Sequence, residues 1–217
     1  MRKSVKLKSE DVMLKNVNNN AESPIRDKNI LFITGNFHKF NEVRSILSPK
    51  GIAVSMLRMK GVEIQSDYIS EIAEYCAVEA FHQCHMPLIV EDAGLFIEAL
   101  EGFPGPYSAY VYKTIQNSGI LKLMEKIHTR KATFCSAIVY YSQETGPLLF
   151  EGKTEGEITL TERKGDSNSG FGFDPIFQPF NSEKTFAEMT LKEKNELSHR
   201  AKAVNKFVEW HNGYNDF

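Results

Sequence analysis

Hydrophobic positions near the start of the chain follow first a strand pattern and then a helix pattern. Residues 30–33 (ILFI) form a continuous apolar run, which is typical of a strand buried on both faces. The polar sequence TGN at 34–36 breaks this run, and apolar residues then recur at helical spacing over residues 37–47. Pro and Gly at 49 and 51 end the pattern. We therefore expect a strand, a tight turn and a helix.

The same alternation continues through the next fifty residues. Residues 52–57 predict a second strand, and residues 69–84 predict a helix with one apolar face. Residues 87–90 (PLIV) predict a third buried strand, which ends at Glu91 and Asp92. Alternating strands and helices indicate an α/β fold whose sheet is at least partly parallel or mixed.

The second half of the chain carries longer strand patterns. Residues 102–106 (GFPGP) predict a rigid turning loop, and the spacing of apolar residues over 121–127 predicts a helix. Residues 132–141 and 148–160 are rich in β-branched and aromatic residues, with Gly146-Pro147 as a hairpin signal. Near the C-terminus, TLKE at 190–193 fits a capping box, so we expect one helix from Leu191 whose later turns pack through residues 204–208.

Composition narrows the class of protein. With 217 residues, 41% of them hydrophobic, the chain suits one domain with two lobes. A net charge of −2 argues against a nucleic-acid binder, and the longest apolar runs are too short to span a membrane. The three cysteines have no CxxC spacing and suit a reduced, cytoplasmic protein. We interpret residues 1–28, which lack a signal-peptide core, as a flexible extension, and residues 29–217 as the domain.

Three places carry candidate chemistry. The turn at 34–39 (TGNFHK) precedes a helix, where backbone N–H groups and Lys39 could seat phosphates, although an ordinary glycine turn capped by Asn36 explains it equally. Glu91, Asp92 and Glu63 follow predicted strands and could hold Mg²⁺ or activate water, or could be solvated loop acids. Lys194 and Ser198-His199-Arg200 could grip oxygens, or form an exposed charged face.

Long motifs then resemble one family. They are TGNFHKFNEV at 34–43, VEDAGLFIEALEGFPGPYSAY at 90–110, GFGFDPIFQP at 170–179 and KTFAEMTLKEKNELSHRAKA at 184–203. Their order and content resemble the inosine/xanthosine triphosphate pyrophosphatases, the Ham1-like enzymes of non-canonical purine nucleotides. The resemblance implies an elongated mixed sheet flanked by helices, with two lobes around a central nucleotide-binding cleft, in a homodimer. It also implies hydrolysis of ITP, dITP or XTP to the monophosphate and pyrophosphate with Mg²⁺, for which Mn²⁺ is a possible substitute.

The resemblance also implies roles for individual residues. Asp92 would activate water and, with Glu63, bind the metal. The triphosphate would be bound by Thr34, Gly35, Asn36 and Lys39, and Ala93 would also contact the substrate. The base and phosphate pocket would comprise Phe171, Gly172, Phe173, Asp174, Lys194, His199 and Arg200. The side chains of Phe173 and Phe177 are nevertheless expected in the core, while Phe171 stacks on the base and Asp174 anchors the turn or accepts from a ring N–H.

Base choice has a physical basis in the donor groups. Hypoxanthine and xanthine carry an oxygen at position 6 where adenine carries an amino group, so a donor such as Arg200 favours the former. Two positions depart from many relatives, which have lysine where Cys76 stands and a basic residue at Ala109. Another cation could contact the phosphates, or turnover could be weaker. Two alternatives remain: a nucleotide-binding module with little catalysis, and nucleic-acid binding through residues 1–28.

Overall fold

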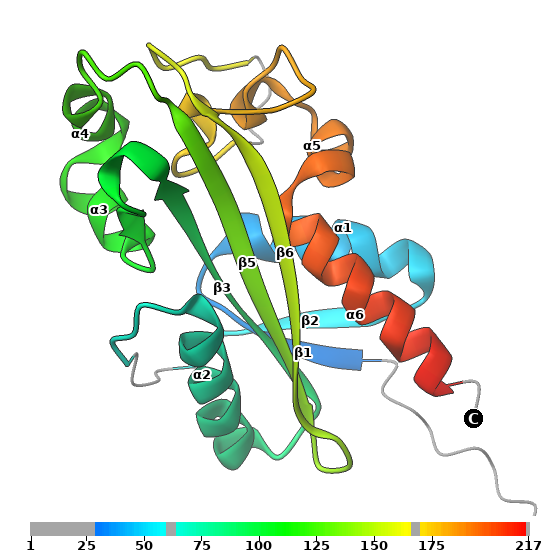
Figure 1. Cartoon of the computed structure of the whole chain (residues 1–217). Helices are drawn as coiled ribbons and strands as arrows, with labels where there is room; N and C mark the ends of the chain where they lie inside the picture. Colours follow the sequence, from blue (N-terminus) through cyan, green and yellow to red (C-terminus); the bar gives the residue numbers. More distant parts are fainter. Residues whose placement is uncertain (1–28, 60–63, 166–169, 216–217) are drawn as a thin grey trace, which may run out of the picture.

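The computed structural model describes residues 29–59, 64–165 and 170–215 (Figure 1). The extension over residues 1–28 and the candidate metal ligand Glu63 therefore lie outside the described residues. The first half alternates strand and helix as expected. Its elements are β1 (Asn29–Ile33), α1 (Phe37–Leu47), β2 (Ala53–Leu57), α2 (Ile69–Cys84) and β3 (Leu88–Ile97).

The second half is built around two long strands. They are β5 (Lys131–Ser142) and β6 (Gly146–Ile158), joined by a tight hairpin in which Gly146 takes a φ of 65°. The other elements are β4 (Pro104–Gly105), α3 (Ser108–Thr114), α4 (Gln116–Leu123), β7 (Phe177–Pro179), α5 (Leu191–Leu197) and α6 (His199–Asn215). Short 3₁₀ turns connect several of them, and one of these begins at Asp174.

The described strands form one sheet in the order β2-β1-β3-β5-β6-β7, with β4 paired to β3. β1 pairs in parallel with β2 and β3, whereas β3-β5, β5-β6 and β6-β7 are antiparallel. The expectation of a mixed α/β sheet is confirmed. Figure 1 shows β5 and β6 running along the length of an elongated molecule.

Helices cover both faces of this sheet. α1 and α6 pack on one face, where Phe32, Val43 and Phe207 belong to one buried cluster. α2 packs on the other face against alternate residues of β3 and β5, such as Val90 and Val139. A third cluster joins α3 and α4 to the far ends of β3 and β5. The far end, with α3, α4 and α5, forms one lobe in Figure 1, and the end with α2, β1 and β2 forms the other.

Three sequence predictions need correction. The third strand does not end at Glu91 and Asp92, because β3 continues to Ile97 by pairing with β5 along its whole length. The C-terminal helix is not continuous, because Ser198 takes an extended conformation (φ −70°, ψ 149°) that separates α5 from α6. The helix expected over residues 121–127 instead covers Gln116–Leu123, and α3 precedes it. Tertiary pairing and local turns decided these boundaries.

Candidate functional site

The site forms where β3 loses one neighbour. Pairing between β1 and β3 ends at Ile33 and Val90, and the chain after β1 turns into the start of α1. The next residues of β3, Glu91 and Asp92, therefore lie beside this turn although they are inside a strand. Side chains alternate between the faces of a strand, so Glu91 points to the α1 and α6 face and Asp92 to the α2 face.

The turn at Thr34-Gly35-Asn36 satisfies its own backbone. The Asn36 side chain accepts hydrogen bonds from the N–H groups of His38 (2.9 Å) and Lys39 (3.2 Å), and Thr34 Oγ1 accepts from the Asn36 N–H (3.1 Å). These bonds confirm the alternative that Asn36 caps the helix, and phosphate binding at this turn stays a prediction. The Thr34 hydroxyl, the Asn36 amide and the Lys39 ammonium can still donate to an anion.

Glu91 is the first centre of a buried ionic network. Its carboxylate pairs with the Lys39 ammonium at 2.8 Å and with Arg200 Nε at 3.1 Å, and it accepts a hydrogen bond from the Ser136 hydroxyl at 2.7 Å. Burial by itself would raise the pKa of Glu91, but the charges of Arg200 and Lys39 outweigh it and hold that pKa well below its ordinary value. Glu91 is therefore a buried carboxylate that joins α1 to α6, not a solvated loop acid.

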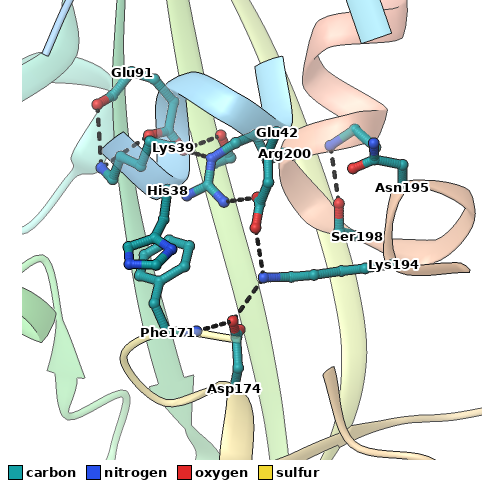
Figure 2. Close-up of polar contacts among 12 residues, drawn as sticks. His38, Lys39, Glu42, Glu91, Phe171, Asp174, Lys194, Asn195, Ser198 and Arg200 are labelled. Atoms are coloured by element: carbon teal, nitrogen blue, oxygen red, sulfur yellow. Dashed lines mark hydrogen bonds and ion pairs between the residues drawn. The ribbon is translucent and has the colours of Figure 1, made fainter. Parts of the chain in front are cut away.

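Glu42, on α1, is the second centre. It pairs with Arg200 and with Lys194, whose ammonium lies 2.6 Å from Glu42 and 2.6 Å from Asp174 (Figure 2). Burial opposes the ionisation of Glu42, but Arg200 and Lys194 lower its pKa below the ordinary value. Burial raises the pKa of Asp174, which has Lys194 as a partner and the like charge of Glu42 nearby. Lys194 is fully buried and Arg200 is 2% exposed, so both are held in place.

The loop at Gly170-Phe171-Gly172 covers this network. The Phe171 ring lies 4.9 Å from the Lys194 ammonium and 5.5 Å from the Arg200 guanidinium, measured to the ring centroid. Its backbone N–H donates to Asp174 Oδ2 at 2.7 Å, which confirms that Asp174 anchors the turn. Gly172 takes a φ of 61°, a conformation that glycine adopts without strain. The exposed His38 ring stacks on Phe171, as Figure 2 shows.

Two predicted pocket residues have their side chains in the core. Phe173 is 3% exposed and packs edge-on against Tyr112, and Phe177 is fully buried, as expected. His199 is 2% exposed and stacks on Phe134 with ring centroids 4.6 Å apart. Burial lowers the pKa of His199 well below its ordinary value, with the charge of Arg200 adding to the effect. His199 is therefore a neutral, packed imidazole.

The fold thus brings together most of the residues singled out from the sequence. One side gathers Lys39, Phe171, Asp174, Lys194 and Arg200. Asp92 and Ala93, both half-buried, follow Glu91 in β3, with the Asp92 side chain on the α2 face, and Gly35 is exposed in the turn. Sequence reasoning missed Glu42 and His38. The signal for Glu42 was available, since it is an acidic residue next to Val43 on the apolar side of an amphipathic helix.

Other parts of the site bear on metal and phosphate binding. Within the described ranges, no group of three or more His, Cys, Asp or Glu side chains gathers as a metal cluster. Cys76 lies on α2 and Ala109 is exposed on α3. Neither side chain is positively charged, so neither position supplies a cation to the phosphates.

In the same described part of the chain, no helix is both long enough and apolar enough to cross a membrane.

The site combines an open α/β sheet, a turn with hydrogen-bond donors at the end of a strand, and buried cations under an aromatic ring. These features are typical of a protein that binds a phosphorylated, planar ligand. Comparison with known proteins gives the family. A profile of the Ham1 family matches residues 30–210, so the chain belongs to this family, as the sequence resemblance indicated.

Several relatives are similar over almost their whole length. The dITP/XTP pyrophosphatase of Methanopyrus kandleri is 48% identical over 182 residues, which cover 84% of this chain and 95% of the relative. The protein of the same name from Thermococcus kodakarensis is 46% identical, covering 83% and 96%. Among solved structures, the Ham1 protein of Staphylococcus aureus has a TM-score of 0.73 at 25% identity, covering 86% of this chain and 99% of that one. The structural match confirms the fold class.

Proposed function

We propose that this protein hydrolyses non-canonical purine nucleoside triphosphates, namely dITP, ITP and XTP, to the monophosphate and pyrophosphate. The observation that carries the proposal is the pair of buried cations, Lys194 and Arg200, lying under the Phe171 ring. The names of the relatives, dITP/XTP pyrophosphatase, agree with it. Such an enzyme removes deaminated purines from the nucleotide pool before they enter nucleic acids.

Selection against adenine follows from the donor character of this pair. Arg200 and Lys194 can donate hydrogen bonds but cannot accept them. A purine with an oxygen at position 6 satisfies such a donor, whereas the amino group of adenine would leave two donors facing each other. Each unsatisfied buried group costs about 1–3 kcal/mol, so a single mismatch lowers affinity by roughly fivefold to 150-fold. Because both cations are anchored by Glu42, they cannot swing away to avoid the mismatch.

The triphosphate would extend from the base pocket toward the start of α1. There the Thr34 hydroxyl, the Asn36 amide and the Lys39 ammonium can donate to phosphate oxygens, with Gly35 allowing close approach. Lys39 is paired with Glu91 and its side chain is 18% exposed, so it reaches the surface while staying oriented. Glu91 therefore acts as a positioning residue for Lys39.

Asp92 is proposed to accept a proton from the attacking water, since it lies in β3 just past the point where pairing with β1 ends and the chain turns into α1. Mg²⁺, or Mn²⁺ in its place, would be held by Asp92 and Glu63 together with phosphate oxygens. This donor set fits Mg²⁺, which binds through one or two carboxylates plus substrate phosphates and does not need a cluster of protein ligands. When bound, the ion neutralises phosphate charge.

Two further proposals concern assembly and location. We expect a homodimer, which is supported by several large apolar side chains exposed on the α3 and α4 lobe: Phe103, Tyr107, Tyr110, Ile115 and Leu123. Sedimentation velocity would test this, since a monomer at micromolar concentration would contradict it. A cytoplasmic location is proposed because the substrates occur there.

The function is tested by incubating the purified protein with dITP, XTP, ATP and GTP in the presence of Mg²⁺ and measuring pyrophosphate. Pyrophosphate from dITP and XTP, at rates well above those for ATP and GTP, is the expected result. Equal rates on all four, or release of single orthophosphate, would contradict the proposal. Tight binding of ITP with no hydrolysis under any Mg²⁺ or Mn²⁺ concentration would instead select a nucleotide-binding module.

A further inference from the structure

The two cations that would read the base are closed off from solvent in this structure. The Lys194 side chain has no exposed surface, and that of Arg200 is 2% exposed. A hydrogen bond brings its two heavy atoms to about 2.9 Å, so a purine cannot bond to a donor that has no exposed surface. Because Glu42 anchors both cations, the groups that cover them have to move when a base binds.

Phe171 covers both cations. The inner face of its ring lies over them, with the ring centroid 4.9 Å from the Lys194 ammonium and 5.5 Å from the Arg200 guanidinium. The His38 ring stacks on Phe171, with centroids 5.1 Å apart and ring planes at 16° (Figure 2). A base that approaches the cations from solvent therefore has to displace the Phe171 ring, and an outward movement of that ring has to displace His38.

The backbone around Phe171 is held in place, so the movement falls to the side chain. The Phe171 N–H donates to the buried Asp174 carboxylate at 2.7 Å. On the other side of the ring-bearing residue, the amide of Asn117 on α4 donates to the Gly172 carbonyl at 3.3 Å. The loop is thus tied before and after Phe171, and the ring opens by rotation about its own side-chain bonds.

His38 opposes this rotation but can give way. Its backbone N–H is bonded to Asn36, whereas its side chain is exposed to solvent and can change rotamer. A rotation of the His38 ring into solvent breaks the contact with Phe171. A stacked aromatic pair is worth about a two- to twelvefold change in an equilibrium constant, so the contact favours the closed position of Phe171 by about that factor.

We propose that Phe171 and His38 form a gate over the base site. His38 holds the Phe171 ring closed over Lys194 and Arg200, and an incoming purine opens the gate by turning both rings outward. This rests on the proposed function, because it takes the purine to be read by these two cations. The apparent affinity for a purine is reduced by the fraction of molecules in which the gate is open. His38 therefore lowers the affinity for any purine nucleotide, and selection at position 6 stays with the cations.

The test compares variants of the full-length protein by calorimetric titration with IMP. His38→Ala removes the outer ring and should lower the dissociation constant about two- to twelvefold, because the open fraction rises. His38→Phe keeps a stacked ring and should keep the wild-type value. Phe37→Ala removes a ring that is 60% exposed at the neighbouring position and should also leave the value unchanged. An equal or higher dissociation constant in His38→Ala would overturn the proposal, since His38 would then not hold a gate or would itself bind the nucleotide.

A double-mutant cycle shows whether His38 acts through Phe171. In the Phe171→Ala background there is no ring to hold closed, so His38→Ala should not change IMP binding further. A remaining gain in affinity there would overturn the proposal. Inorganic triphosphate has no base to admit, and its dissociation constant should be equal in the wild-type protein and in His38→Ala. A matching fall would assign the effect to the phosphates and would also overturn the gate.

The two proposals can fail separately. If the wild-type protein binds IMP but hydrolyses no triphosphate, the proposed function fails alone, and the IMP titrations still decide the role of His38. If the wild-type protein releases pyrophosphate from dITP but His38→Ala binds IMP with an unchanged dissociation constant, the gate fails alone. If neither the wild-type protein nor His38→Ala binds IMP, both proposals fail.

Discussion

Replacing Glu91 with glutamine tests whether the buried ionic network is an essential part of the fold. The change keeps the size of the side chain and removes one charge from a carboxylate that faces Lys39, Arg200 and Ser136. After the change, Arg200 keeps Glu42 as an anionic partner, whereas Lys39 loses its ion-pair partner. A glutamine amide also presents two donors to groups that are themselves donors.

The structure sets the size of the expected effect. The Glu91 side chain has no exposed surface and that of Arg200 is 2% exposed, so solvent cannot compensate for the lost charge. Removing one partner of a buried pair costs about 3–5 kcal/mol. For a chain of this size that corresponds to a fall in Tm of about 6–20 °C, at about 2–4 °C per kcal/mol.

Urea unfolding followed by circular dichroism measures the free energy of unfolding of each variant. The matched control is Glu162→Gln, which removes a carboxylate from an exposed pair with Lys164 and should change stability by about 1 kcal/mol or less. Because the folded-state pKa of Glu91 is lowered, its contribution is complete above pH 4.5 and is lost as pH falls below that value. The difference between wild type and Glu91→Gln should therefore narrow in acid. Equal stability of the two proteins at pH 7 would refute the reasoning.

Three other predictions follow from single residues. Asp92→Asn should nearly abolish pyrophosphate release from dITP while the circular dichroism spectrum stays unchanged; a fully active variant would remove Asp92 from the mechanism. The lowered folded-state pKa of His199 means that only the unfolded chain takes up this proton as pH falls below 6.5, at a cost of about 1.4 kcal/mol per pH unit. His199→Phe, which keeps a ring against Phe134, should therefore flatten the urea-derived stability profile between pH 6.5 and 5.5, and an unchanged slope would contradict the assignment. Gly152→Ala should lower Tm strongly, because the new Cβ would lie 2.0 Å from the His199 carbonyl oxygen, whereas Gly213→Ala, with nothing within 4 Å, should not.

The sequence predicted most elements because their signals are local. The helix over residues 69–84 was placed with its observed bounds, and the capping box at Thr190 and Glu193 is present in the structure. Strand ends were less well predicted. β3 reads as a buried strand only up to Val90, and its continuation through Glu91 and Asp92 depends on pairing with β5, about forty residues later in the chain.

The site was predicted in its residues but not in its connections. Long motifs identified Lys194 and Arg200, but a sequence does not show that both are anchored by Glu42, more than 150 positions away. The break at Ser198 had no warning in the helical pattern, since Lys194 and Ser198 also fit one continuous helix. His38 was passed over because its stacking partner lies on a loop in the other half of the chain.

By itself, then, the sequence determined the α/β class, most of the helices and strands, the Ham1 motifs and the kinds of chemical groups available. Hydrophobic period, caps and turns act over a few residues, so they can be read in order along the chain. Only the tertiary structure decided which charges neutralise one another, that Glu91 is buried while Asp92 lies on the other face of β3, and that His38 faces Phe171. Burial and ion pairing depend on what packs from distant segments, because the cost of burying a charge is offset only by a partner brought there by the fold.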